Sequence, residues 1–345
     1  NETPDHKFSQ RFLLTEWEQI VDAWQVDSEG AYANVSRLGR KTRIPKKQQI
    51  ILWSIFQRVQ EGLQSGRLIT TSTVFTKLAS AISNEKAPPF DFAVVDEAQD
   101  LTVAHLRFFA AIGGNRPNSL FFAGDLGQRI FQQPFSWSEL GVDIRGRSQN
   151  LAVNYRTSHQ IRSQSDRLLN PEMSDLDGNL QDRSGTISVF NGPVPTVRTF
   201  KSEDEETESV SLWLADRLAE GVVAHEFGIF VRSAAQLPRA RAALERAKIP
   251  FKVLDEDVDT TSNFASIATM HLAKGLEFRA VVVMACDDEV IPSQERIETV
   301  GDDADLQEVY DTERHLLYVA CTRARDYLLV TAVEPASEFL DDLRS

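Results

Sequence analysis

Long apolar runs, signal sequences and cysteines are scarce or absent in this sequence. No run of apolar residues approaches the length of a membrane span, and no segment resembles a signal peptide. Cysteine occurs twice, at Cys286 and Cys321, each time among apolar residues. Two such thiols indicate neither a disulfide framework nor a metal site, and the six histidines show no ligand spacing. We therefore expect a cytoplasmic protein with reduced cysteines in its core.

Positive charge is also in short supply. The 345 residues include 37 Lys and Arg against 51 Asp and Glu, which gives a net charge of −14. This balance argues against indiscriminate binding to nucleic acid, because a polyanion then needs a locally basic groove. The stretch from Arg37 to Lys47 contains no acidic residue, and it includes Arg40, Lys41 and Arg43. It is either a patch that contacts phosphates or a solvated loop.

A starting methionine is absent as well, since residue 1 is Asn. We expect from this that the sequence is a fragment of a longer protein. The composition is ordinary for a globular chain, with 42% hydrophobic and 26% charged residues. A length of 345 residues is sufficient for two domains with their own cores.

Apolar periodicity predicts helices first and an alternation of strands and helices afterwards. Residues 1–88 are predicted to be mainly helical, with the basic stretch between the first two helices. The later strands are predicted at Phe90–Val95, Leu120–Ala123, Ile187–Phe190, Val197–Phe200, Phe227–Val231, Phe251–Leu254, Ile267–Met270, Ala280–Cys286 and Tyr327–Val333. The later helices are predicted at Val103–Ile112, His159–Leu169, Glu203–Glu220, Gln236–Lys248 and Thr312–Ala324. This alternation predicts an α/β fold with parallel sheets and helices on both faces. The acidic stretch Asp287–Glu308 is expected to be a mobile loop.

The stretch from Phe90 to Asp100, FDFAVVDEAQD, organises the rest of the chain. Its apolar first half predicts a strand buried in a parallel sheet, and Asp96 and Glu97 follow where that strand ends. Ligands of open α/β sheets gather at the carboxyl ends of strands. Asp96 can there hold Mg²⁺, directly or through water, and Glu97 can orient or deprotonate the water that attacks a phosphoryl group. For the DE pair alone, a strand followed by an acidic turn is the alternative.

Five further strings follow this stretch at ordered intervals. They are FAGDLGQRIF, LAVNYRTS, FGIFVRSAAQLPRARAALERAKIPF, TMHLAKGLEF and ERHLLYVACTRAR. Together with VVDEAQD, they resemble the motifs of the UvrD/Rep/PcrA-like branch of superfamily 1 DNA helicases, in the family's order. A single string is weak evidence, but six strings in one order are specific.

The resemblance implies an architecture and an activity. It implies two RecA-like lobes with parallel sheets, the first of them incomplete here, plus an N-terminal helical insert. Residues 1–88 are then the insert beside the DNA, residues 89–152 the rest of the first lobe, and residues 153–345 the second lobe. ATP and Mg²⁺ would bind between the lobes, and hydrolysis would drive 3′-to-5′ movement on single-stranded DNA or on a single-strand/duplex junction. A non-catalytic module that binds DNA or protein is the alternative, and an RNA substrate stays open.

The same resemblance assigns roles at the nucleotide. Asp96 would organise Mg²⁺, Glu97 would organise the attacking water, and Gln128 would sense the γ-phosphate and couple it to the DNA. Arg156 and Arg323 would act as arginine fingers, because a planar guanidinium can bridge phosphate oxygens and stabilise transition-state charge. For each arginine alone, a surface ion pair is the alternative interpretation.

Further roles concern the ribose and the DNA strand. Glu277 would accept a hydrogen bond from the nucleotide ribose, and Arg314 would support the same cleft. Thr269 and Lys274 would face the cleft or the DNA. The residues implied at the DNA are Arg37, Arg40, Lys41, Arg43, Phe135, Trp137 and His271. His271 can equally be a structural histidine with satisfied hydrogen bonds.

The main departure from the family pattern is a missing P-loop. A P-loop needs Gly-Lys-Ser/Thr so that backbone amides and the lysine can cradle phosphates, and the chain contains no Gly-Lys dipeptide. The string Gly39-Arg40-Lys41-Thr42 is not a P-loop, because Arg40 intervenes and no strand precedes it. We expect the P-loop strand to lie upstream of this sequence.

Two smaller departures concern base stacking and size. Relatives carry a tryptophan shortly after the third-motif glutamine, and Gln133 holds that place here. Phe131, Phe135 or Trp137 can substitute, because any exposed aromatic offers a face for stacking, although each can also belong to the core. The interval between the fourth and fifth motifs leaves no room for the regulatory subdomain of larger relatives.

Overall fold

The computed structural model describes residues 8, 10–35, 44–85, 87–114, 116–125, 128, 135–169, 172–174, 180–182, 185–255, 263–298 and 303–344. The chain divides into two compact units. Unit 1 comprises Asn1–Ser148 and Ser174–Leu180, and unit 2 comprises Gln149–Met173 and Gln181–Ser345. In the part of the chain that the structure describes, no helix is both long and apolar enough to cross a membrane.

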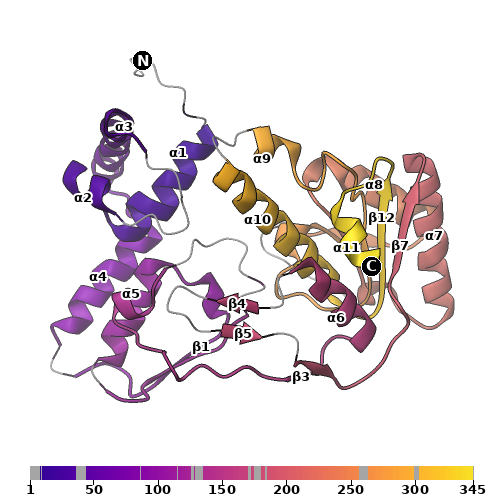
Figure 1. Cartoon of the computed structure of the whole chain (residues 1–345), viewed down its shortest axis with the longest axis horizontal. Coiled ribbons are helices and arrows are strands. Elements are labelled where there is room, and N and C mark those ends of the chain that lie inside the picture. Colours follow the sequence, from indigo (N-terminus) through magenta and orange to yellow (C-terminus); the bar gives the residue numbers. More distant parts are fainter. Residues whose placement is uncertain are drawn as a thin grey trace. The chain divides into compact units, whose positions relative to one another are not determined.

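Helices build the first part of unit 1 (Figure 1). They are α1 (Gln10–Glu16), which continues into a π-helical turn, α2 (Glu29–Asn34), α3 (Lys46–Ser65) and α4 (Thr71–Ser83). Apolar residues at helical spacing, among them Ile20, Leu52 and Phe56, pack into one shared core. Inside that core the Tyr32 hydroxyl donates a 2.7 Å hydrogen bond to the buried Glu16 carboxylate. The helical character predicted for this region is confirmed for its described residues.

Two short parallel strands follow in unit 1, with a helix between them. They are β1 (Ala93–Val95) and β2 (Leu120–Phe122), and the connecting helix is α5 (Val103–Gly113). The Thr102 hydroxyl caps α5 by accepting from the backbone N–H of His105. Val95, Leu106 and Leu140 lie in the core that joins the strands to α5.

The prediction that this first strand is buried on both faces is wrong for β1. Val95 is buried, but Phe92 and Val94 are 72% and 76% exposed, and Phe121 of β2 is 63% exposed. The physical reason is the size of the sheet. The described part of unit 1 pairs only β1 with β2, so α5 covers one face and no described element covers these three side chains.

Unit 2 is built on a six-stranded sheet in the order β7-β12-β11-β8-β10-β9, with all of its pairs parallel. The strands are β7 (Thr196–Phe200), β8 (Phe227–Val231), β9 (Phe251–Val253), β10 (Ala265–Thr269), β11 (Phe278–Val283) and β12 (Ala324–Val333). Helices α7 (Glu203–Ala219) and α8 (Leu237–Arg246) pack on one face (Figure 1). Helix α6 (His159–Ser165) contacts β12, α10 (Asp303–Cys321) contacts β11 and β12, and α11 (Phe339–Arg344) contacts β7. The predicted α/β class with a parallel sheet is confirmed.

The central strand β8 shows how both faces of this sheet are filled. All five of its residues are buried, as expected of a strand covered on both sides. Phe227 and Ile229 join the core beneath α7 and α8, whereas Phe230 packs edge-on against Phe278 at 5.9 Å. A Cβ at Gly228 would lie 2.5 Å from the Phe278 ring, so this position needs glycine.

Two further strand pairs are short. β3 (Val153–Asn154) pairs with β6 (Ile187–Ser188) in unit 2, and β4 (Glu172–Ser174) pairs with β5 (Leu180–Asp182) where the chain passes between the two units. The prediction of a loop over Asp287–Glu308 is partly wrong, because α9 (Gln294–Glu298) lies inside it and α10 begins at Asp303. The acidic residues that suggested a loop suit the beginning of a helix, where the positive end of the helix dipole lies.

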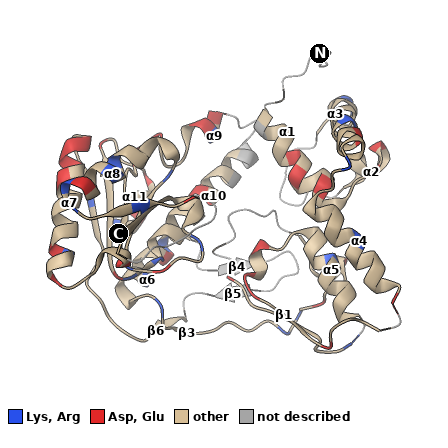
Figure 2. Ribbon diagram, turned by 180° about the vertical axis from the view of Figure 1, so that it is seen from behind, with Lys and Arg blue, Asp and Glu red and all other residues tan. Residues whose placement is uncertain are grey.

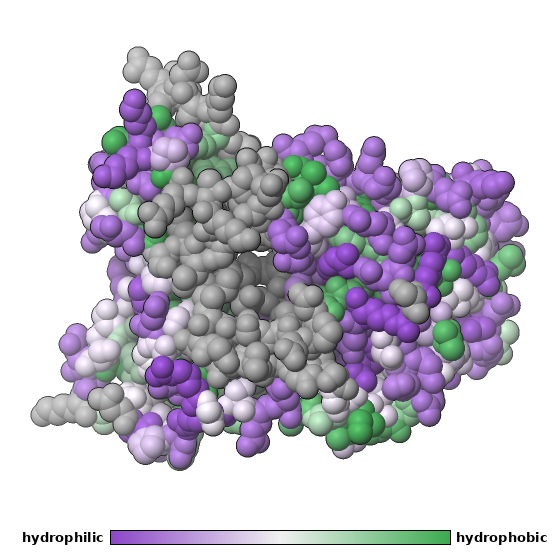
Figure 3. Space-filling view, viewed as in Figure 1, coloured by the Kyte–Doolittle hydropathy of each residue, from purple (hydrophilic) through white to green (hydrophobic). Residues whose placement is uncertain are grey.

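Charge and hydropathy follow the fold. The first turn of α7 carries Glu203, Asp204, Glu205 and Glu206, visible in red in Figure 2. The Ser202 hydroxyl caps this helix by accepting from the Glu205 N–H. On the face of unit 2 in Figure 3, hydrophilic residues predominate and apolar ones are scattered.

Both cysteines are free and fully buried in unit 2. Burial raises the pKa of Cys321 to about 12, so its sulfur stays protonated at neutral pH. The prediction of core thiols is confirmed.

Candidate functional site

Two polar loops meet at one edge of the small sheet in unit 1. Asp96 and Glu97 follow β1, and Asp125 and Gln128 follow β2. Because the strands are parallel neighbours, their carboxyl ends lie side by side. The backbone N–H of Ala98 donates to the carbonyl of Ala123 at 2.8 Å and ties the loops together.

The turn after β1 directs two carboxylates to the surface. Glu97 has φ 52° and ψ 40°, a left-handed conformation that is uncommon for a residue other than glycine. Its backbone N–H donates to Asp96 Oδ1 at 2.8 Å. Both residues are exposed, as ligand-contacting carboxylates must be. The predicted pair thus lies at the edge of the sheet where the sequence placed it.

The donor set at this edge fits magnesium better than a metal that needs a protein cage. Within the described residues, no three His, Cys, Asp or Glu side chains gather closely enough to hold a metal ion. Mg²⁺ keeps several waters and often takes only one or two carboxylates together with substrate phosphates. The exposed Asp96 carboxylate meets this limited requirement.

A second site forms within unit 2, where residues from three motifs converge. The Arg156 Nε lies 3.0 Å from Glu277 Oε2. The Arg323 guanidinium donates to the carbonyl of Leu276 at 3.3 Å, one residue away. Glu277 directly precedes β11 and Arg323 directly precedes β12, so the cluster lies where these strands begin. This is the opposite edge from the one that parallel sheets ordinarily offer to ligands.

The two arginines of this cluster have different surroundings. The Arg156 side chain is 49% exposed and bonds Glu277, an arrangement that leaves it accessible to a ligand. Arg323 is only 1% exposed, and its Nε donates to the Val319 carbonyl at 3.0 Å. Arg323 therefore supports the packing of α10 against the loop before β11, and its role as an arginine finger stays a prediction.

The fifth-motif segment connects the two edges of the sheet in unit 2. Thr269 ends β10, and His271 lies in a 3-10 turn directly after it. Glu277 precedes β11, which runs parallel to β10 through β8. Residues 270–277 therefore run from the carboxyl edge of the sheet to its amino edge. His271 and Lys274 are both half-buried, and their predicted contact with DNA or nucleotide stays a prediction.

Arg314, predicted to support the nucleotide cleft, packs elsewhere in unit 2. Its guanidinium lies 4.3 Å from the centre of the Phe339 ring and pairs with Asp342. Both partners belong to α11. Arg314 thus attaches α11 to α10 by a cation–π contact and an ion pair.

The predicted DNA contacts are placed only in part. Arg37, Arg40, Lys41 and Arg43, like Phe131 and Gln133, lie outside the described residues. Trp137 packs against Phe122 with ring centres 5.0 Å apart, and Phe135 lies 5.8 Å from Trp137. Both are half-buried at the rim of the β1–β2 core, so a role in base stacking stays a prediction.

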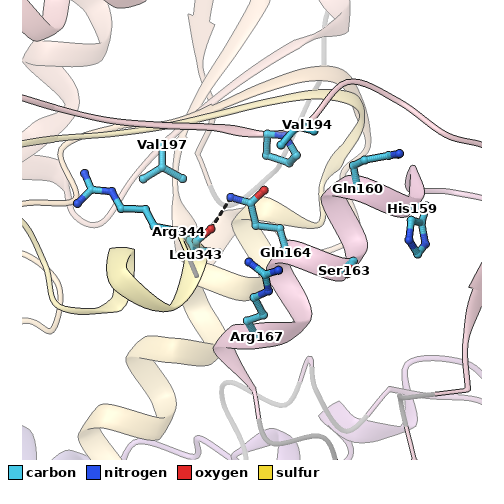
Figure 4. Close-up of a pocket in the computed structure, with 10 residues that line it drawn as sticks. His159, Gln160, Ser163, Gln164, Arg167, Val194, Val197, Leu343 and Arg344 are labelled. Atoms are coloured by element: carbon cyan, nitrogen blue, oxygen red, sulfur yellow. Dashed lines mark hydrogen bonds between the residues drawn. The ribbon is translucent and has the colours of Figure 1, made fainter.

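A hollow of about 500 Å³ in unit 2 is separate from both sites. α6, the segment before β7, and α11 line it, with Gln164 donating to the Leu343 carbonyl across it (Figure 4). The labelled side chains of His159 and Arg344 point away from this hydrogen bond. Neither Arg156, Glu277 nor Arg323 lines the hollow.

Sequence reasoning assigned no role to Gln99 and Asp125, which connect the two loops of unit 1. Gln99 accepts from the Asp125 N–H at 3.0 Å, and Asp125 accepts from Gln128 Nε2 at 2.9 Å. Both residues lie inside motif strings, and this membership was the signal that the sequence offered for them. The pairing could be identified only once β1 and β2 were known to be parallel neighbours.

Comparisons with known proteins find similarity to UvrD-like helicases. Residues 256–335 match the family model of the UvrD-like helicase C-terminal domain. The ATP-dependent DNA helicase UvrD2 of Mycobacterium tuberculosis H37Rv is 29% identical over 230 residues, which are 64% of this chain and 32% of the relative. The ATP-dependent DNA helicase PcrA of Staphylococcus aureus MRSA252 is 40% identical over 79 residues, 23% of this chain and 10% of the relative. The chain therefore spans about a third or less of these relatives.

A solved structure is also similar, at low level. It is the C-terminal domain of a possible DNA helicase from Lactobacillus plantarum, with 22% sequence identity and a TM-score of 0.38. The match covers 55% of this chain and 94% of that chain. A likeness at this level carries no argument about function.

Proposed function

We propose that this chain, a relative of the UvrD/PcrA-like superfamily 1 helicases, is part of an ATP-dependent motor that moves on DNA. The observation that carries the proposal is the convergence of Arg156, Glu277 and Arg323 in unit 2. These residues come from three motifs far apart in the sequence, and ion-pair and hydrogen bonds bring them to one loop. An arginine with a carboxylate at its side suits the phosphates and ribose of a nucleotide.

In the proposed reaction, the residues of both units act on one ATP molecule. Glu97 orients the water that attacks the γ-phosphate, and Gln128 positions that water or the phosphate. Arg156 neutralises the charge that develops on the phosphate oxygens, and Arg323 does so too or holds the loop before β11 in place. Asp96 would hold a Mg²⁺ ion, which would supply neutralisation of phosphate charge. We propose 3′-to-5′ movement on single-stranded DNA as the work that hydrolysis drives.

We further propose that a P-loop strand outside this sequence completes the first lobe. The chain has no Gly-Lys dipeptide, and the apolar side chains of Phe92, Val94 and Phe121 are exposed on β1 and β2. A strand pair of this kind is marginal alone and gains stability from further strands and a covering layer. The added strand would bring the phosphate cradle next to Asp96 and Glu97.

A non-catalytic module that binds DNA or protein is the second candidate, and the missing Gly-Lys dipeptide is the observation that favours it. The full-length gene product separates the two functions. The motor predicts ATP hydrolysis that single-stranded DNA stimulates and that Glu97→Gln abolishes, together with displacement of a labelled strand. DNA binding with no hydrolysis by the full-length wild type would instead support the binding module.

A further inference from the structure

The Gln99 side chain is held at both ends in the loop after β1. It is only 7% exposed. Its Nε2 donates to Glu97 Oε2 at 2.5 Å, and its Oε1 accepts from the backbone N–H of Asp125 at 3.0 Å. Because the amide has a donor end and an acceptor end, only one orientation makes both bonds.

The backbone around the amide is shaped to admit it. A Cβ at Gly124 would lie 2.5 Å from Gln99 Oε1, closer than real side chains approach. Gly124 is the second residue after β2, and the glycine allows the amide of one loop to enter the turn of the other. A side chain at position 124 would displace the Gln99 amide from this place.

The hydrogen bonds continue from Gln99 to the predicted phosphate sensor. Gln128 Nε2 donates to Asp125 Oδ2 at 2.9 Å, and the Gln128 backbone N–H donates to the Asp125 carbonyl at 2.9 Å. A continuous path thus runs from the Glu97 carboxylate through Gln99 and Asp125 to Gln128. The Asp125 N–H needs only the acceptor end of Gln99. The donor end, which bonds Glu97, is therefore available to orient the Glu97 carboxylate.

We propose that Gln99 is a positioning residue that holds the Glu97 carboxylate in register with the Gln128 loop, an inference that rests on the proposed function. Glu97 is exposed and itself adopts the left-handed conformation, and the Gln99 amide donates directly to its carboxylate. Hydrolysis requires the carboxylate to stay within hydrogen-bond reach of the attacking water. Misplacement of a reacting group by about 1 Å can cost on the order of 100-fold in rate.

The test uses the full-length gene product with two substitutions that separate the ends of the amide. When ionised, Gln99→Glu keeps an acceptor for the Asp125 N–H and sets a second carboxylate against Glu97 in place of the donor, whereas Gln99→Met removes both bonds at similar volume. The Gln99→Glu assay is repeated toward alkaline pH, because a protonated carboxyl at position 99 would donate to Glu97 again. Gln60→Met is the matched control, because this half-buried glutamine of α3 donates to the Val26 carbonyl at 2.7 Å, away from the site. The measurements are kcat and KM for ATP with saturating single-stranded DNA, DNA affinity and the melting temperature.

We expect kcat to fall about 10- to 100-fold in both Gln99 variants, with KM and DNA affinity close to wild type. The melting temperature should fall, because the variants lose buried hydrogen bonds, and it serves to show that each variant is folded at the assay temperature. Gln60→Met should keep the wild-type kcat. Near-wild-type kcat in Gln99→Glu overturns the proposal even if Gln99→Met is impaired, because Asp125 alone would then need the amide. If Gln99→Met does not fold, Gln99→Glu decides. A wild-type protein without DNA-stimulated hydrolysis overturns the proposed function itself. If the wild type is active, the Gln99 variants test the positioning role alone.

Discussion

At the residue scale, Arg156 is half-exposed and Arg323 is buried, so their substitution should affect protein stability to different degrees. In the complete protein, Arg156→Ala should lower ATP turnover by roughly 10³- to 10⁵-fold, the range known for arginine fingers. Its melting temperature should hardly change, because the side chain is 49% exposed. Arg323→Ala should lower turnover similarly and also destabilise unit 2 by about 1–3 kcal/mol, because buried carbonyls of Val319 and Leu276 lose a donor.

Steady-state ATPase assays and thermal melts of the same preparations check this contrast. Arg325→Ala is a suitable control, since Arg325 is a near neighbour with a 55% exposed side chain paired to Asp326. The control should keep wild-type turnover and stability. Near-wild-type ATPase activity in Arg156→Ala would remove this residue from the reaction.

Individual site residues were predictable to different degrees from the sequence. Glu97, Arg156 and Glu277 stand in motif strings, and the placement of Arg156 beside Glu277 agrees with a shared role. The hydrogen bond between Gln99 and Asp125 was not predictable, because it depends on β1 and β2 being adjacent. The burial of Arg323 also follows from tertiary packing, since nothing local distinguishes it from the exposed Arg325.

At the scale of elements, a buried ion network joins the helices on one face of unit 2 to the ends of its strands. Glu206 of α7 is fully buried and pairs with Arg239 of α8. Its other oxygen accepts from Thr331 Oγ1 of β12 at 2.7 Å and from the Ala285 N–H, just beyond β11, at 3.1 Å. Four elements therefore share one carboxylate.

Removing that carboxylate should strongly destabilise unit 2. Glu206→Ala leaves the buried Arg239 charge with a weaker set of partners, and losing one member of a buried pair typically costs about 3–5 kcal/mol. Urea unfolding at neutral pH measures the change. Glu208→Ala is the control, because its 58% exposed carboxylate makes a loose pair with Arg246 and should contribute about 1 kcal/mol or less. An equal loss of stability in both variants would contradict the inference that the buried network stabilises unit 2 more than a surface ion pair does.

Glu313 of α10 should make the free energy of unfolding of unit 2 depend on pH. Burial alone would raise the pKa of Glu313, but the hydrogen bond and charge of Arg232, with the charge of Arg296, outweigh burial and hold the pKa below its usual value. Because the pKa of Glu313 is lower in the folded than in the unfolded state, the ionised carboxylate stabilises the fold above the unfolded pKa of about 4.3. This stability is lost as the pH falls through the folded pKa.

Wild type should therefore be more stable than Glu313→Gln at pH 7, and the difference should shrink as pH falls below about 4. Urea unfolding across pH 7 to pH 3 tests this. Asp341→Asn is the control, since its carboxylate is 80% exposed. A stability difference that stays constant down to the acid limit would contradict the linkage.

The elements themselves were largely predictable where periodicity was strong. The predicted strand Phe227–Val231 and the helix from Glu203 agree with β8 and α7. The beginning of α10 was missed because acidic residues suit helix starts and loops alike. The exposure of β1 was missed because the number of strands in a sheet depends on the whole unit, which apolar runs do not encode.

At the scale of the whole molecule, residues 1–345 alone should hydrolyse ATP poorly or not at all. The reason is the absence of a Gly-Lys dipeptide, which removes the phosphate cradle that this chemistry needs. A coupled ATPase assay with and without single-stranded DNA measures turnover. Robust DNA-stimulated hydrolysis that Glu97→Gln abolishes would contradict the proposed location of the P-loop outside this sequence.

The net charge of −14 makes any DNA contact depend on a few local basic residues. We expect Arg40, Lys41 and Arg43, which lie outside the described residues, to contact phosphates rather than bases. Affinity should then fall with salt by about 0.7 to 0.9 in log–log slope per phosphate contact. The triple alanine variant should bind all sequences more weakly, with a slope shallower by about 2 to 3.

A salt titration of wild type and the triple variant with several single-stranded sequences makes the comparison. Removing three exposed positive charges elsewhere, at Arg198, Arg246 and Lys248 of unit 2, controls for the change in net charge. If the basic run is the DNA contact, this control keeps the wild-type slope, because only side chains that contact phosphates release counterions. An unchanged slope in the Arg40, Lys41 and Arg43 variant would show that the run is a solvated loop. DNA would then have to be held by other basic residues.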